Sequence, residues 1–565
     1  YNNGKIEFSD ESQAIMVKSV SSIVVGDNYV GGIAGFNDVK GVLDVNYTLI
    51  GGQIYAYENC AGGAFGFNAS VEAAQQNLTI KPRSVQGRYF VGGVIGANVL
   101  NIGENTEISD LRADNILGTI TGEAFCGGII GYQRTYTDAQ IPVSASADDT
   151  DAGIRVSVEA NAAQILPGIQ SGNIPASVME SANTNTLTIS TNGNTADNLS
   201  INTNNIPIEA VMYSGGVLGY CEKNSKVQIK NCKNAGNITF VSDLLKDNDV
   251  SGGAVKLGAY AASGEIPELL STDAEDLELH FIGGITGVTL ENETITHCTN
   301  TGSLSGFTGI GGVVGLNAGT VTNCELREHF GNAALEYVGG IVGINSNGGK
   351  VMSCSTASGK TIAGSDHLGG IVGWNLKGGT LTGNTNNATV NASGADASGL
   401  AAVGGLVGQN SGDIMLSEDS TSSSRSVSGM RGAGVGGMVG INEAGGTIQF
   451  GGMTDTNGEI VAVSDKVTVQ GYEKVGGIVG INHGTFDRSE NNTYVAAKAK
   501  KVQASHGTVG GIAGTTDGMI CYAVNRCDSV SADAGNAGGI VAENTNTRAA
   551  IQNCTNYGDV RSSDG

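Results

Sequence analysis

The chain has 565 residues, with 54 acidic and 30 basic side chains, a formal net charge of −24 and 89 glycines. This acidic balance disfavours nucleic acid as a partner, because binding to phosphates needs a basic stripe. The sequence holds no run of 18 apolar residues, so it predicts no membrane insertion within this chain. Its first residues lack the pattern of a secretory signal, which favours a mature or trimmed product.

A glycine-rich motif, Val-Gly-Gly-Ile-Val-Gly-x-Asn, recurs from residues 30–37 to a worn copy at residues 537–544. Most copies stand 28 to 40 residues apart, and a period in this range indicates stacked structural units. The first glycines of the fourteen copies are Gly31, Gly62, Gly92, Gly127, Gly215, Gly283, Gly311, Gly339, Gly369, Gly404, Gly436, Gly476, Gly510 and Gly538.

Within each unit, short segments rich in Val, Ile and Thr alternate with Gly and Asn, which is typical of β-strands separated by turns. One unit is too small to bury a core, whereas stacked units share an apolar column and pair their strands in parallel. We therefore expect a right-handed parallel β-helix, a β-solenoid, of about 14 to 16 coils with loop insertions. A strand spacing near 4.8 Å predicts a rod of about 70 Å for the repeats.

Three motif positions support this stacking. The residue two after the first glycine is apolar in every copy, as an inward column requires, and Ile341 is one example. The residue four after it is glycine except at Ala542, which indicates a side-chain collision or an unusual backbone angle. We interpret the asparagines six after it as a structural ladder of stacked amides that also tolerates a left-handed corner. They are Asn37, Asn68, Asn98, Asn317, Asn345, Asn375, Asn410, Asn442, Asn482 and Asn544.

A second half-unit accompanies the motif, for example His-Cys-Thr-Asn-Thr-Gly-Ser-Leu at residues 297–304, with similar segments at 231–238 and 553–560. With these two parts the sequence resembles the GLUG motif, a glycine-rich repeat of bacterial surface and secreted proteins that also accompanies some large extracellular peptidases. The resemblance covers most of the chain. It implies a bacterial, extracellular scaffold and supplies no catalytic residues.

The repeat is interrupted twice. We expect N-terminal solenoid repeats over residues 1–133, a Ser/Thr/Asn-rich insertion over 134–212, and one repeat over 213–240. An irregular insertion or degenerate repeat at 241–280 precedes the C-terminal repeats at 281–565. Because insertions on solenoids often emerge on the binding face, we expect the 134–212 insertion to determine binding and its removal to leave the coils intact.

Five cysteines share nearly the same repeat phase: Cys232, Cys298, Cys324, Cys354 and Cys554. A column of small buried thiols explains this phase most simply, because cysteine packs as a compact apolar residue. Disulfides between neighbouring coils are the alternative, with Cys521 and Cys527 the first pair to test. The absence of a C-x-x-C pair leaves a zinc site without support.

The sequence predicts no enzyme, no catalytic residue and no cofactor-binding residue, because it contains neither H-E-x-x-H nor G-x-S-x-G. Residues 432–437 match the dinucleotide pattern G-x-G-x-x-G, but they form one copy of the repeat. Asp148, Asp149 and Asp151 are the candidate metal ligands, and calcium is the ion that such oxygen ligands hold. A solvated loop is the favoured interpretation, since no downstream Glu completes a calcium loop.

Aromatic residues occupy the position two before the first glycine in six copies: Tyr29, Phe90, Phe125, Tyr213, Phe281 and Tyr337. Their shared phase favours a ladder of packed rings over an exposed carbohydrate platform. The single tryptophan, Trp374, is expected at an exposed corner beside the motif asparagine, so its replacement by Ala should leave folding intact.

The leading hypothesis is an extracellular bacterial structural scaffold, an adhesin stalk or a surface filament, that binds or assembles through inserted loops and coil ends. Its expected partners are further copies of itself, or a surface protein or glycan of the host or of bacteria. The alternative is a carbohydrate-active β-helix enzyme, or the accessory region of a large secreted enzyme. Two or three carboxylates converging on one exposed face would favour that enzyme.

Overall fold

The computed structural model describes residues 2–7, 19–44, 47–75, 78–109, 111–114, 118–136, 145–150, 153–158, 185–190, 204, 206–222, 225–241, 280–306, 308–329, 336–393, 401–416, 426–451, 454–487, 493–546 and 550–563. By its internal contacts the chain divides into two units, Tyr1–Leu277 and Glu278–Gly565, and each unit has its own stack of parallel strands.

The described strands stack into a β-solenoid of about 12 turns, which confirms the predicted fold class. The expected 14 to 16 coils are slightly too many, because the first two repeats lack the third strand of a complete turn. After their asparagine strands stand β4 (Val42–Asp44), which pairs with β1 (Lys5–Glu7), and the helix α1 (Val71–Ala74). This helix has four residues and is the only one among the described residues.

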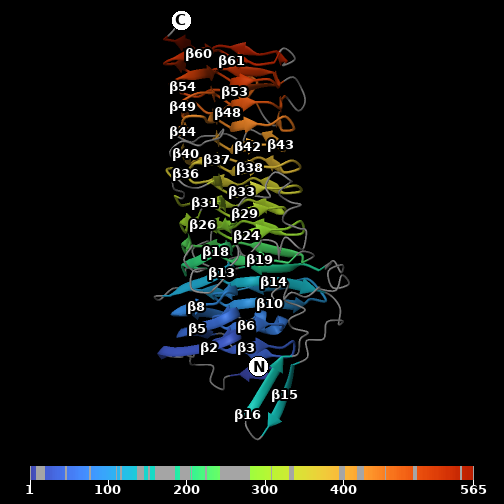
Figure 1. Ribbon diagram of the computed structural model, residues 1–565. Coiled ribbons are helices and arrows are strands. Elements are labelled where there is room, and N and C mark those ends of the chain that lie inside the picture. Colours follow the sequence, from blue (N-terminus) through green and yellow to red (C-terminus); the bar gives the residue numbers. More distant parts are fainter. Residues whose placement is uncertain are drawn as a thin grey trace. The chain divides into compact units, whose positions relative to one another are not determined.

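Three sheets repeat through the second unit. The asparagine sheet holds the strands that end at the motif asparagine or its replacement, and Figure 1 shows several of them one above another. Its strands are β24 (Thr286–Thr289), β29 (Val314–Asn317), β33 (Val342–Asn345), β38 (Val372–Asn375), β42 (Val407–Asn410), β46 (Val439–Asn442), β51 (Val479–Asn482), β56 (Ala513–Thr516) and β61 (Val541–Asn544).

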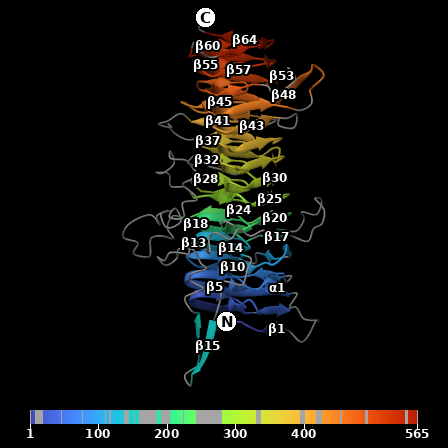
Figure 2. The same cartoon turned by 90° about the vertical axis from the view of Figure 1, so that its right-hand side faces the viewer.

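The glycine-pair sheet holds the strands that lead into each glycine pair, and Figure 2 shows β28 to β45 of this sheet in one column. Its strands in the second unit are β23 (Ile282–Gly283), β28 (Thr308–Gly311), β32 (Glu336–Gly339), β37 (Asp366–Gly369), β41 (Ala402–Gly404), β45 (Gly434–Gly436), β50 (Val475–Gly476), β55 (Gly507–Gly510) and β60 (Gly535–Gly538).

The threonine sheet follows the asparagine sheet along the chain and completes each turn. Its strands in the second unit are β25 (Thr294–Thr296), β30 (Thr320–Thr322), β34 (Lys350–Met352), β39 (Thr380–Thr382), β43 (Asp413–Leu416), β47 (Thr447–Phe450), β52 (Thr485–Phe486), β57 (Met519–Cys521) and β62 (Ile551–Gln552).

Smaller sheets fill the rest of the second unit. The lateral sheet consists of β36 (Thr361–Gly364), β40 (Thr389–Ala392), β44 (Ser426–Ser428), β49 (Thr468–Gly471), β54 (Lys501–Ala504), β59 (Val530–Ala532) and β64 (Val560–Ser562). Another sheet contains β48 (Glu459–Val463), β53 (Tyr494–Ala497), β58 (Ala523–Asn525) and β63 (Thr555–Asn556). The remaining short strands are β26 (Thr299–Asn300), β27 (Leu304–Ser305), β31 (Glu325–Leu326) and β35 (Ser355–Thr356).

The first unit repeats the same three sheets with longer strands. Its asparagine sheet holds β3 (Ala34–Asn37), β6 (Phe65–Asn68), β10 (Ile95–Asn101), β14 (Ile130–Tyr136) and β19 (Leu218–Cys221), and its threonine sheet holds β11 (Thr106–Ser109), β17 (Leu187–Ser190) and β20 (Val227–Lys230). The other parallel strands are β2 (Ser19–Gly31), β5 (Tyr47–Gly62), β7 (Leu78–Lys81), β8 (Ser84–Gln86), β9 (Tyr89–Gly92), β12 (Arg112–Ala113), β13 (Thr119–Gly127), β18 (Ile208–Gly215), β21 (Lys233–Asn234) and β22 (Ile238–Phe240).

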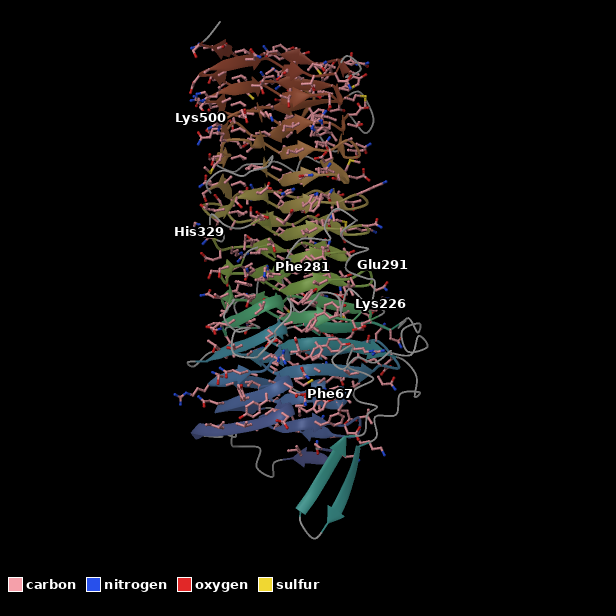
Figure 3. The ribbon with its side chains drawn as sticks, in the orientation of Figure 1. Phe67, Lys226, Phe281, Glu291, His329 and Lys500 are labelled. Carbon is pink, nitrogen blue, oxygen red and sulfur yellow. The ribbon has the colours of Figure 1, made fainter. Side chains whose placement is uncertain are left out.

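The predicted apolar column forms the core of both units. Ile341 is fully buried, and the equivalent side chains in the neighbouring repeats, Val313 and Ile371, are buried to the same degree. Ile33 in the first repeat and Ile540 in the last are only half-buried. Figure 3 likewise shows the buried Phe67 among the strands of the first unit and the exposed Lys226 at their edge.

The motif glycines are required by close backbone approach. A Cβ on Gly340 would meet the carbonyl oxygen of Gly370 in the next turn, and a Cβ on Gly343 would lie 2.7 Å from the carbonyl oxygen of Gly315. Neither Gly340 nor Gly343 has a positive φ. The collision explanation is therefore confirmed at Gly343, the residue four after the first glycine of its repeat, and the explanation by unusual backbone angles is not needed there.

The 134–212 segment is not a simple loop insertion, contrary to our expectation. Its strand Leu187–Ser190 pairs in parallel with β11 and β20, and Leu187 and Ile189 are buried in the core. Residues 208–212 likewise begin β18, which pairs with β13. We now expect removal of the whole segment to break a turn. Between these strands, β15 (Ala145–Thr150) and β16 (Gly153–Val158) form an antiparallel pair. Nearly all of the 241–280 segment lies outside the described residues.

Candidate functional site

The motif asparagines form a buried ladder of amides, as predicted. Asn375 is fully buried: its Oδ1 accepts a hydrogen bond of 2.8 Å from Nδ2 of Asn345, and its own Nδ2 donates one of 2.8 Å to Oδ1 of Asn410. In the first unit Asn68 donates in the same way to Asn98. The ladder asparagines do not adopt positive φ, so the expected left-handed corner is wrong.

The same bond pattern joins most members of the ladder. It links Asn37 to Asn68 and Asn98 to Gln133 in the first unit, and Asn317 to Asn345, Asn410 to Asn442 and Asn442 to Asn482 in the second unit. Asn544 in the last turn is exposed, and its Oδ1 accepts a bond from the N–H of Asn546. The ladder is therefore a structural element, because its polar atoms are satisfied within the protein.

A second set of buried asparagines comes from the half-units and was not predicted as a ladder. Asn300 donates from Nδ2 to the carbonyl of Gly302 and accepts from the N–H of Gly302 at Oδ1, both at 3.0 Å. Asn204 makes the same local bonds and also donates to Asn234 in the next turn. The half-unit pattern Cys-x-Asn-x-Gly was the sequence signal for Asn234 and Asn300, whereas Asn204 lies outside any such pattern.

The column of buried thiols is confirmed at Cys232, Cys298, Cys324 and Cys354, whereas Cys554 is only half-buried. All ten cysteines are free thiols, so the disulfide alternative is wrong, including for Cys521 and Cys527. Cys298, Cys324 and Cys354 are buried in successive turns, and each Sγ donates a hydrogen bond of 3.3 Å to the carbonyl two residues earlier. Burial raises the pKa of the Cys354 thiol well above its usual range, which keeps this thiol protonated and unreactive.

The aromatic residues before the glycine pairs form a packed ladder in the first unit. The Phe125 ring stacks on Phe90 at 5.2 Å and on Tyr213 at 5.1 Å between ring centroids, and all three side chains are buried. This arrangement excludes these rings as a carbohydrate platform. Their backbones are left-handed, with φ of 58° at Phe90 and Phe125 and 51° at Tyr213. This conformation is uncommon for bulky residues, and no sequence pattern predicted it.

Trp374 does not stand at an exposed corner. It lies within β38, half-buried, with its ring 5.3 Å from those of Tyr337 and His367. The expectation that its replacement by Ala leaves folding intact is therefore revised.

The structure does not describe how the side chains of the three acidic candidates for a metal site are arranged. The backbones of Asp148 and Asp149 lie in β15, whereas Asp151 and all three side chains are outside the described residues. Across the rest of the described chain, no three His, Cys, Asp or Glu side chains gather as metal ligands would. Residues 434–436 of the dinucleotide-like segment form β45, a strand of the glycine-pair sheet, which confirms that they belong to the repeat.

A groove of about 360 Å³ in the second unit is the candidate binding site. It is lined by residues of the lateral-sheet strands β44, β49 and β54 and of the turns that follow β44, β49, β54 and β59. Backbone hydrogen bonds join successive turns along the groove. The N–H of His506 donates to the carbonyl of Tyr472 at 2.7 Å, and the N–H of Asp533 donates to the carbonyl of Ala504 at 3.0 Å. The backbone of the groove is therefore built on the parallel ladder.

An aromatic and cationic column forms one part of the groove wall. The guanidinium carbon of Arg431 lies 5.3 Å from the centroid of the Tyr472 ring. The same ring stacks on the imidazole of His506, with centroids 4.5 Å apart and an interplanar angle of 16°. Tyr472 is half-buried, whereas Arg431 and His506 are exposed. Because Arg431 and His506 belong to the turns before and after Tyr472, they cover opposite faces of its ring and hold it in place, while its edge and hydroxyl remain for a ligand.

Amides, hydroxyls and one carboxylate complete the groove. Gln470 pairs in register with Ser428 on one side and Gln503 on the other, so these three side chains project from the same face of the lateral sheet. Nε2 of Gln503 donates to Oδ1 and Oδ2 of Asp533 at 2.9 and 2.8 Å. These groups supply both donors and acceptors to a ligand.

Arg431 differs from the other arginines that the structure describes in the second unit, Arg327, Arg526 and Arg561, because no acidic side chain among the described residues pairs with it. Lys498 binds Asp455 at 2.6 Å, and Arg526 binds Glu459 through two bonds of 2.6 and 2.7 Å. Burial opposes ionisation of Asp455, but Lys498 and two backbone N–H groups outweigh it and lower its pKa to about 2. The guanidinium of Arg431 thus keeps its N–H donors for a ligand.

The sequence interpretation missed the groove. Tyr472 and His506 each stand four residues before the first glycine of their repeat, so their shared phase was the available signal. The described part of the chain contains no helix with the length and apolar character that a membrane span requires. Neither a scan against protein-family models nor searches of the curated proteins and of the solved structures find a match to this chain.

Proposed function

We propose that this chain is an extracellular structural scaffold of the bacterial surface, an adhesin stalk or filament, that binds a glycan through the groove around Tyr472. The stacked turns and the resemblance to the GLUG repeat support the scaffold role. The groove supports the binding role, and it replaces the 134–212 insertion as the proposed determinant because that segment contributes strands to the core.

The chemistry of the groove suits a saccharide. Arg431 and His506 cover the two faces of the Tyr472 ring from the turns before and after it, so Tyr472 offers the groove its edge and its hydroxyl, which can bond a sugar hydroxyl. The amides of Gln470 and Gln503 and the carboxylate of Asp533 can bond sugar hydroxyls, which both donate and accept. The preformed backbone limits the entropy that binding would cost.

Binding without cleavage is the better-supported form of this function. Glycosidases generally place two carboxylates on either side of the bond that they hydrolyse. Among the described residues that line the groove, Asp533 is the only carboxylate, and it already accepts two hydrogen bonds from Gln503. No observation therefore favours the carbohydrate-active enzyme.

A glycan array probed with the full chain tests the proposal. We expect binding to a subset of glycans and its loss in Tyr472→Ala. Tyr494→Ala is the matched control, because Tyr494 is also half-buried in the second unit but packs against Tyr522, outside the groove. Release of shortened saccharides from a bound glycan would contradict the non-enzymatic role. Equal binding by the Tyr472→Ala variant would contradict the groove.

A further inference from the structure

Resting on the proposed glycan binding, we infer that the groove selects an acidic saccharide whose carboxylate binds the guanidinium of Arg431. A guanidinium offers two parallel N–H donors that match the two oxygens of a carboxylate, and such charge-assisted pairs are stronger than neutral hydrogen bonds. The ligand class is therefore an oligosaccharide that carries a uronic or sialic acid.

The position of Arg431 supports this selection. The centroid of the Tyr472 ring lies 5.3 Å from the guanidinium carbon of Arg431. This aromatic contact restricts the position of the guanidinium in addition to the attachment of the side chain to its backbone. No acidic side chain among the described residues competes for it, although the chain carries 54 acidic against 30 basic residues. In a protein of this charge, an unpaired arginine beside an aromatic face is a local site for an anion.

The two ends of the groove also differ in charge. Arg431 follows β44 and Asp533 follows β59, three turns further on in the same unit, which corresponds to about 14 Å at the spacing of parallel strands. Asp533 repels a second carboxylate at its own end but accepts hydrogen bonds from hydroxyls. We expect the acidic sugar to lie at the Arg431 end and a neutral sugar at the Asp533 end.

Matched pairs of saccharides test the inference. The full chain is probed with an array of uronic and sialic acid oligosaccharides, each beside its methyl ester, and with sulfated counterparts. Calorimetry then gives Kd for the strongest pair. We expect the free acid to bind about tenfold more tightly than its ester, because a hydrogen-bonded charge contributes at least that much. Added salt should weaken only the binding of the acid.

Two substitutions assign the effect to its residue. Arg431→Gln should remove the preference for the acid while the ester still binds, and Arg431→Lys should restore part of it. Lys377→Gln removes the same charge from an exposed turn between β38 and β39 and should change nothing. Equal affinity for acid and ester, tighter binding of the sulfated counterpart, or an unchanged preference in Arg431→Gln would overturn the inference and leave glycan binding standing. If no saccharide binds, the proposed function falls with it.

Discussion

The ladder of buried asparagines makes a quantitative prediction about stability. In Asn375→Ala the bond from Asn345 and the bond to Asn410, both 2.8 Å long, are lost. Nδ2 of Asn345 keeps the carbonyl of Gly349 at 3.2 Å, but Oδ1 of Asn410 is left without its donor in a fully buried position. The lost bond that leaves this buried acceptor without a donor costs about 1–3 kcal/mol, and the lost bond from Asn345 costs about 1 kcal/mol more. We therefore expect the free energy of unfolding to fall by about 2–4 kcal/mol.

Equilibrium unfolding in urea, followed by circular dichroism of the full chain, measures this loss. Asn347→Ala is the matched control, because Asn347 is an exposed asparagine in the turn that follows ladder residue Asn345. Hydrogen exchange of the strands β38 and β42 tests whether the damage is local, as expected for a stack in which each turn contacts its neighbours. If the two variants unfold within about 0.5 kcal/mol of each other, the ladder does not stabilise the solenoid as argued.

Four further predictions concern the core and its charges. Ile341→Asp should cost several kcal/mol, because a carboxylate would be buried in the apolar column, and failure to lower the thermal midpoint would refute that column. Trp374→Ala should cost about 2 kcal/mol in urea unfolding through lost ring contacts, and a neutral result would restore the exposed corner. The depressed pKa of Asp455 contributes stability that is present above about pH 4 and is lost as the pH falls through about 2, so Lys498→Met should reduce the acid sensitivity of the thermal midpoint. The Cys354 thiol should resist alkylation, read by mass spectrometry, until urea unfolds the chain, whereas rapid labelling would contradict its burial.

The repeat phase was enough to predict the position of a residue that packs beside the equivalent residue of the next turn. Ile341, Asn375 and Cys354 each have an equivalent residue beside them in the neighbouring turn, and parallel stacking brings equivalent positions together without further information. The handedness and the length of the predicted rod stay predictions.

Features outside the strict period depended on the tertiary structure. The segment Leu187–Ser190 lies in a stretch that lacks the motif, yet it completes a turn because it pairs in register with strands on both sides. Trp374 was predicted to stand at an exposed corner only from its place beside the motif asparagine, whereas its actual exposure depends on packing against Tyr337 in the preceding turn.

The sequence by itself determined the parallel stack, its apolar column and its amide ladder, and it favoured free thiols over disulfides, which the structure then decided. The tertiary structure alone decided the left-handed aromatic corners and the groove. Arg431 and Asp533 stand five residues before the first glycine of their repeats and Tyr472 stands four before, so the repeat phase places them alike, but in turns of different length and composition. Their proximity is set by the ladder of strands that carries those turns, and a binding site built from irregular loops on a regular scaffold becomes visible only when that ladder is formed.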